Sequence, residues 1–239
     1  MRRTLFLLGL MLGLAAAAAG DVRIRESQHV DGYYSGGVTE PARDQQNEYW
    51  FAGDRLAYRS GLRSYIVDQA AGRFLFVNHT DKTYVETPLP LDLRRIVPEI
   101  LSGYFELIRR RGSVTLTGTV ADKGGHPCRS CLLKIHTGEF DADMTLWLST
   151  DVPFDWRRLG QLFSQVRRMV NYGDELIAAI GAQEGFPLAS EFTYYVEGMQ
   201  IRGNTRVIDW TELEAPPGTY AAPAGYTRKE QLQPQDLDN

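Results

Sequence analysis

The sequence predicts an α+β protein in which a strongly curved antiparallel sheet of about ten strands carries two amphipathic helical segments on its concave face. Two observations lead to this fold class. Short segments rich in aromatic and β-branched residues follow one another along most of the chain, separated by turn residues, as antiparallel strands do. Two longer segments replace this alternation with apolar residues spaced three and four apart, which is typical of amphipathic helices.

The expected strands form successive hairpins. The first lies at 22–30, a hairpin follows at 47–60, three strands fill 63–87, three more lie between 113 and 150, and two close the sheet between 190 and 213. Several, such as FLFV at 74–77 and TLWL at 145–148, are apolar on both faces. Their aromatic residues either fill the core and a covered outer face, or line a lipid cavity or a docking patch.

Each expected helix has its own apolar stripe. In 91–110 the stripe is interrupted by Pro98, which must start the main helix or kink it. In 155–181 Asp155 is a plausible N-cap, and Gly173 with Asp174 divides the segment into two helices. The stripes comprise Leu93, Ile96, Val97, Ile100, Leu101, Tyr104, Leu107 and Ile108 in the first segment, and Leu159, Leu162, Phe163, Val166, Met169 and Val170 in the second.

Two striped helices laid on a wide apolar sheet leave an apolar cavity wherever the cover is incomplete. The candidate cavity residues are Ile100, Leu101, Tyr104, Leu159, Phe163, Val166, Phe192 and Tyr194.

The two ends of the chain indicate where the protein works. Residues 1–20 combine two arginines, an apolar run from Leu5 to Leu14 and an alanine-rich stretch, which is the pattern of a cleaved signal peptide. The run is shorter than the roughly 20 residues that cross a bilayer. We therefore expect a soluble bacterial protein, periplasmic or secreted, with one domain at 21–228 and a disordered polar tail at 229–239.

The charge excludes one class of partner and leaves another open. A net charge of −4 gives no sign of nucleic-acid binding. Arginine pairs such as Arg157 with Arg158 and Arg167 with Arg168 lie beside apolar residues at helical spacing. We interpret them as solvated helix faces, with attraction to anionic lipid as the alternative.

The order of strands and helices, together with the late GTYAAPAGYTR, resembles the periplasmic lipoprotein carriers and receptors of the LolA and LolB type. The chain also resembles an uncharacterised secreted bacterial family that shares their half-barrel, through LTGTV at 116–120, Gly125 with Cys128, and LWLSTDVP at 146–153. The resemblance implies an open β half-barrel with an apolar interior suited to acyl chains. Cys131 departs from it, because an aromatic residue is expected there.

Both cysteines lie in GGHPCRSCLLKI at 124–135. A disulfide between Cys128 and Cys131 in a hairpin turn is the favoured interpretation, because Gly124 and Gly125 would bend the chain and the compartment is oxidising. Two buried free thiols are the next. A metal site of His126, Cys128 and Cys131, with His136 as a fourth ligand, and thioredoxin-like catalysis remain alternatives.

The leading functional hypothesis is a non-catalytic protein that binds a lipid or acylated molecule without a cofactor. Neither a GxSxG elbow nor an HExxH helix occurs, and no histidine stands beside a nucleophile in a recognisable motif. The alternatives are an envelope thiol or metal protein that uses the HxCxxC segment, and a scaffold that docks an envelope protein partner.

Overall fold

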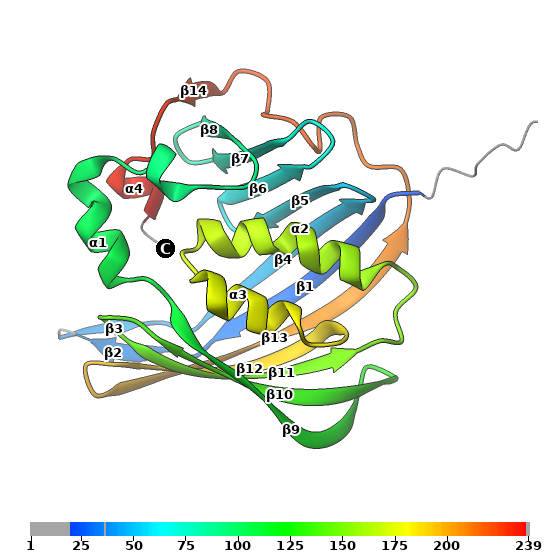
Figure 1. Ribbon diagram of the computed structural model, residues 1–239. Coiled ribbons are helices and arrows are strands. Elements are labelled where there is room, and N and C mark those ends of the chain that lie inside the picture. The colour runs from blue at the N-terminus through cyan, green and yellow to red at the C-terminus, as the bar shows by residue number, and fades with distance from the viewer. Residues whose placement is uncertain (1–19, 36, 238–239) are drawn as a thin grey trace, which may run out of the picture.

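A single sheet of twelve strands runs through the chain, and two helices lie in its concavity (Figure 1). The computed structural model describes residues 20–35 and 37–237. Along the sheet the order is β14-β8-β7-β6-β5-β4-β1-β13-β12-β11-β10-β9. The strands of this sheet are β1 (Val22–Val30), β4 (Arg43–Ala52), β5 (Arg55–Ser60), β6 (Arg63–Asp68), β7 (Arg73–Asn78), β8 (Thr83–Pro88), β9 (Arg111–Lys123), β10 (His126–His136), β11 (Asp141–Ser149), β12 (Phe186–Val196), β13 (Met199–Glu212) and β14 (Thr227–Lys229).

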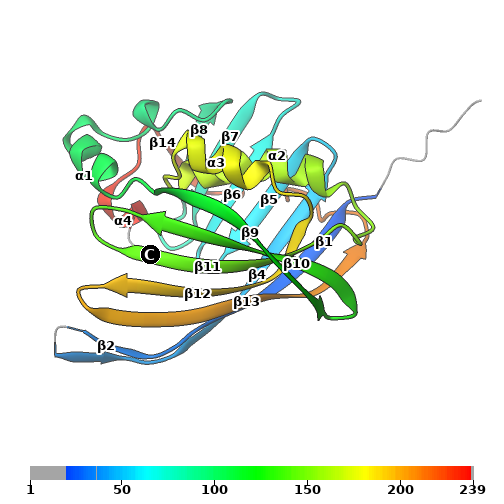
Figure 2. The ribbon, with the colours of Figure 1, turned by 60° about the horizontal axis from the view of Figure 1, so that its bottom comes forward.

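β1 joins two meanders into one sheet. It pairs antiparallel with β4 on one side and β13 on the other, so Ile24 lies between Tyr49 and Trp210. A separate hairpin of β2 (Tyr33–Ser35) and β3 (Val38–Glu40) extends beyond the ends of β1 and β4 (Figure 2). The α+β class and the curved, mainly antiparallel sheet are thereby confirmed, and the sheet is open.

The expected strand count of about ten is wrong, because the main sheet has twelve. The strand that the sequence does not predict is β14, which has three residues and pairs parallel with β8. A segment that short shows no alternation of apolar and polar residues, so its sequence carries no strand signal.

The second helical segment forms as expected. α2 (Trp156–Met169) starts after Asp155, whose side chain accepts a hydrogen bond from the Arg158 backbone N–H. α3 (Asp174–Gly181) begins directly after Gly173. Both helices lie in the concavity of the sheet, where α2 packs over β5, β6 and β12 and α3 packs over β9 (Figures 1 and 2).

The first helical segment is not the expected long helix. It consists of two 3₁₀ turns, η1 (Leu93–Arg95) and η2 (Glu99–Leu101), followed by the six-residue α1 (Ser102–Leu107). Pro98 separates the turns, since its ring disfavours the helical conformation of the residue before it and it has no N–H to donate. The segment therefore lies at the side of the molecule, near α4 (Pro234–Leu237), and α2 and α3 cover the centre of the sheet (Figure 1).

The polar C-terminal segment is ordered as far as Leu237, contrary to the expected disordered tail. The Lys229 Nζ lies 2.7 Å from Asp236 Oδ2, and Asn78 Nδ2 donates to Asp236 Oδ1 at 2.8 Å. Leu232 is almost fully buried, and its backbone N–H donates to the Ile96 carbonyl. One apolar side chain and one buried ion pair are enough to anchor a segment whose composition is otherwise polar.

Strands of the β4–β8 meander are apolar on both faces because another part of the chain covers their outer face. Residues 213–226 cross the outer side of the β4–β8 meander and cover it. The apolar residues of this outer layer are Trp50, Ala57, Ile66, Leu75, Val77 and Tyr220, with Leu213, Ala215, Ala222 and Tyr226 partly buried against them. The chain itself therefore covers the outer face of this half of the sheet.

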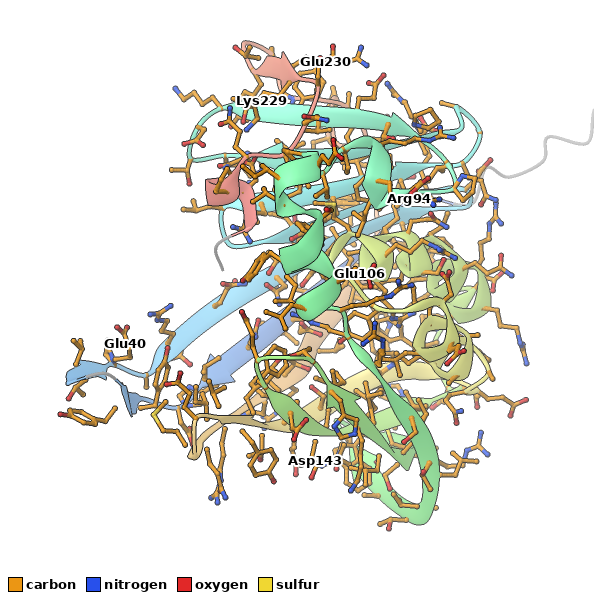
Figure 3. The ribbon with its side chains drawn as sticks, turned by 60° about the vertical axis from the view of Figure 1, so that its left-hand side comes forward. Glu40, Arg94, Glu106, Asp143, Lys229 and Glu230 are labelled. Atoms are coloured by element: carbon orange, nitrogen blue, oxygen red, sulfur yellow. The ribbon has the colours of Figure 1, made fainter. Side chains whose placement is uncertain are left out.

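Replacing Asp236 with alanine removes one partner of the buried ion pair and leaves Lys229 and Asn78 uncompensated. We expect the free energy of unfolding to fall by about 3 kcal/mol, measured by urea denaturation. The control is Glu230→Ala, because Glu230 is exposed one residue after Lys229 (Figure 3); it should change stability by less than about 0.5 kcal/mol. Equal effects of the two substitutions would contradict the anchoring role of Asp236.

Candidate functional site

A cavity of about 920 Å³ lies between the helices and the concave face of the sheet. This volume falls within the roughly 300–1,000 Å³ typical of small-molecule sites. Its apolar lining comes from both halves of the sheet and from both helices: Tyr49, Val67, Leu89, Val114, Leu146, Leu148, Trp156, Leu159, Phe163, Ile177 and Ile180.

A row of aromatic rings crosses the floor of the concavity. Tyr49, Tyr58, Tyr65 and Phe76 occupy directly opposite positions on β4, β5, β6 and β7. Successive ring centroids are 4.6, 5.8 and 5.7 Å apart. From α2, Phe163 adds a ring 5.4 Å from Tyr49 and 5.2 Å from Tyr58. Cross-strand aromatic pairs of this kind stabilise a sheet and also offer a flat apolar surface to a ligand.

The concave face becomes polar next to the aromatic row. Glu26 on β1 lies opposite Asn47 on β4, and it accepts hydrogen bonds from Asn47 Nδ2 at 2.9 Å and from the Tyr49 hydroxyl at 3.2 Å. Gln45 Nε2 donates to Asn47 Oδ1 and to Ser60 Oγ. Burial raises the pKa of Glu26 above its ordinary value, although the hydrogen bonds from Asn47 and Tyr49 oppose that shift.

Arg167 on α2 also lines the cavity. It follows Phe163 by one helical turn, and its guanidinium carbon lies 5.5 Å from the centroid of that ring. Burial lowers the pKa of Arg167, against the effect of Tyr172 and Tyr49. The prediction that Arg167 belongs to a solvated helix face is therefore wrong, because the residue shares the inward stripe of α2.

The structure divides the candidate cavity residues into three groups. Leu159 and Phe163 line the cavity. Val166, Phe192, Tyr194 and Leu101 pack in or against the apolar clusters and are not among its lining residues. Ile100, with 91% of its side chain exposed, and Tyr104, with 45%, face away from the interior, because the break at Pro98 alters the direction in which the stripe points.

A second, more polar hollow of about 1060 Å³ lies outside the helices, against the segment that carries Arg94 and Glu106 (Figure 3). Its charged residues pair with one another: Arg94 with Asp92 at 2.9 Å, Arg109 with Glu106 at 3.2 Å, and Arg168 with Asp174 at 2.5 Å. Leu89 and Pro90 line both hollows and form a wall between them.

The two cysteines lie within strand β10, are fully buried and are not bonded to each other. The expected disulfide is thus absent. The hairpin turn precedes the pair at Gly124 and Gly125, so the chain between the cysteines is extended and spans about 10 Å, beyond the roughly 7 Å that a disulfide allows. The irregularity here is in β9, which places Thr117, Gly118 and Thr119 opposite Ser130 without folding β10 back.

The structure also gives no support to a metal site or a reactive thiol in this segment. Within residues 20–35 and 37–237, no three His, Cys, Asp or Glu side chains gather where they could hold a metal ion. His126 Nδ1 lies 3.1 Å from Asp151 Oδ2, and His136 Nδ1 lies 2.8 Å from Asp141 Oδ1. Burial raises the pKa of both thiols, which is the opposite of what a reactive cysteine needs.

No protein-family model matches this chain, and no curated protein matches its sequence. Among solved structures, a domain from Vibrio parahaemolyticus, provisionally described as belonging to an outer membrane lipoprotein-sorting protein, is 8% identical. The match covers 93% of this chain and 91% of that one, with a TM-score of 0.29. In the part of the chain that the structure describes, no helix has the length and apolar character to span a membrane.

Alkylation tests the state of the cysteines directly. In native protein we expect neither thiol to react with iodoacetamide, because both are buried and their pKa values are raised. In denaturant without reductant, both should be alkylated, as read from the intact mass. If denatured protein reacts only after reduction, Cys128 and Cys131 are disulfide-bonded and the free-thiol arrangement is wrong.

Glu26→Gln tests the polar part of the cavity. The pKa of Glu26 is higher in the folded than in the unfolded chain, so its contribution to stability is present below the unfolded pKa and is lost as pH rises through the folded pKa. The stability of the variant relative to the natural protein should therefore increase as pH rises from about 4, the ordinary range of a glutamate, through the raised pKa of Glu26, measured by urea denaturation. A difference in stability that does not change with pH for Glu26→Gln would contradict the assignment.

Proposed function

We propose that this chain is a non-catalytic bacterial protein of the periplasm or extracellular space that binds a lipid or acylated molecule in the cavity beneath α2 and α3. The observation that carries the proposal is the 920 Å³ cavity, which is lined by the rings of Tyr49 and Phe163 at one end of the aromatic row. Burial of an acyl chain against such a surface contributes about 0.8 kcal/mol for each methylene removed from water. The signal-peptide pattern that supports the location lies at residues 1–20, almost wholly outside the described part of the chain.

A small movement of the helical cover would widen the cavity. Gln165 Oε1 accepts the Leu91 backbone N–H at 2.9 Å, and Asn171 Nδ2 donates to the Phe105 carbonyl at 2.6 Å. These two hydrogen bonds fasten α2 and its C-terminal turn to the segment before β9. Opening them would separate α2 from the Leu89–Pro90 wall and join the cavity to the outer hollow.

The thiol, metal and scaffold alternatives receive no support from a specific observation. The thiols are buried and apart, and the largest patch of outer apolar strands is covered by residues 213–226. We therefore propose ligand binding and no second function.

Native mass spectrometry with a matched pair of variants tests the proposal. Phe163→Asp places a carboxylate in the aromatic row, so binding of oleyl alcohol should weaken by at least about tenfold, which corresponds to 1.4 kcal/mol. Val120→Asp is the control, since Val120 is 67% exposed and lies outside the cavity lining. The proposal fails if the natural protein binds no oleyl alcohol, or if folded Phe163→Asp binds it as the control does.

A further inference from the structure

The cavity contains a cation whose charge no protein group neutralises. Among the described residues, the Arg167 guanidinium makes no hydrogen bond and has no carboxylate within ion-pair distance; its contact is with the face of the Phe163 ring. Arg157 also lines the cavity, but it is exposed near the start of α2, and Arg158 and Arg168 do not line it. Arg157 stacks on Trp156 at 4.3 Å, Arg158 Nε donates to the Gly53 carbonyl, and Arg168 pairs with Asp174.

The geometry of α2 explains why Arg167 points inward and the adjacent Arg168 does not. It is four residues after Phe163, so the two side chains share one helix face, and that face is turned to the sheet. Arg168, the next residue, is rotated by about 100° around the helix and reaches the outer hollow, where it meets Asp174. Arg167 therefore lies on the inner side of the helical cover, and Arg168 lies on its outer side.

The acidic residue of the cavity does not supply the missing charge. Both carboxylate oxygens of Glu26 accept hydrogen bonds, one from Asn47 and one from Tyr49. No ion pair joins Glu26 to Arg167 within 4 Å. A guanidinium stays charged in proteins. Arg167 is partly buried and has no carboxylate partner among the described residues, and partial loss of water around an unpaired charge is unfavourable. The position of Arg167 is best explained if an anion from outside the chain occupies the cavity.

We propose that Arg167 binds the anionic group, a carboxylate or phosphate, of an amphiphile whose apolar chain lies along Tyr49 and Phe163. This inference rests on the proposed function and specifies its ligand class as a single-tailed anionic amphiphile. Guanidinium recognises both oxyanions through two parallel N–H···O bonds. The aromatic row begins at Tyr49, within reach of Phe163 and therefore of the residue stacked on it.

Three probes with the same oleyl chain separate the head group from the tail: oleyl alcohol, oleate and oleyl phosphate, with affinities measured by isothermal titration below their micelle concentrations. The natural protein should bind at least one anion about tenfold or more tightly than the alcohol, the effect expected for charge-assisted hydrogen bonds. The better of the two anions identifies the head group as carboxylate or phosphate.

Arg167→Gln should abolish the preference for the anion, because it removes the charge that binds the anionic group. Arg158→Gln removes the same charge from the same helix outside the cavity and should retain the preference. Thermal unfolding verifies that each variant is folded; if Arg167→Gln is not, Arg167→Met replaces it, because its unbranched side chain occupies similar space without charge.

The inference about Arg167 is overturned if the natural protein binds the three probes equally, or if Arg167→Gln keeps the anion preference. In both cases oleyl alcohol still binds, so the proposed cavity function survives. If no probe binds the natural protein, the cavity function and the inference fail together.

Discussion

Packing of α2 and α3 against the concave face of the sheet is the contact on which the rest of the structure depends. Leu159, Leu162 and Val166 are buried in the core that this contact forms. The concavity is wider than two helices can fill, because a sheet of twelve twisted strands curls as it extends. The remaining space is the cavity. The same packing that forms the core therefore also leaves the cavity in which we propose that the ligand binds.

The two halves of the sheet are held in different ways. The β4–β8 half is covered by the helices on one face and by residues 213–226 on the other. The β9–β13 half lacks such a cover, and β9 exposes Leu116 and Val120. The helix pair bridges the halves, with α2 on β5 and β6 and α3 on β9. A movement of the helices would consequently change the curvature of the sheet as well as the opening of the cavity.

The sequence predicts the parts of this fold that depend on local patterns. The strands, the Asp155 cap and the break at Gly173 all follow from short-range signals, and all appear in the structure. Ile100 is misassigned because its direction depends on how the chain leaves Pro98, which no periodicity encodes. The tail is predicted wrongly because Leu232 and Asp236 are anchored by contacts with Ile96 and Asn78, which lie far away in the sequence.

The candidate site shows the same division between local and long-range information. Phe163 and Leu159 could be predicted from the stripe of α2, whereas Tyr49 and Glu26 enter the site through strand pairing, whose register the sequence leaves open. The sequence predicts Arg167 on a solvated helix face because it is one of a charged pair. Its spacing of four residues from Phe163 places it instead on the inward face.

Arg167 and Glu26 both work against the stability of an otherwise apolar interior. A chain selected for stability alone would place an apolar residue at position 167, where the stripe of α2 requires one. Proteins usually break such local rules at sites that serve a function, and the rest of the structure compensates. Here the compensation comes from the extensive cover of the β4–β8 half, and the polar groups lie beside the cavity rather than in the filled core. Their location, more than their mere presence, ties them to a ligand.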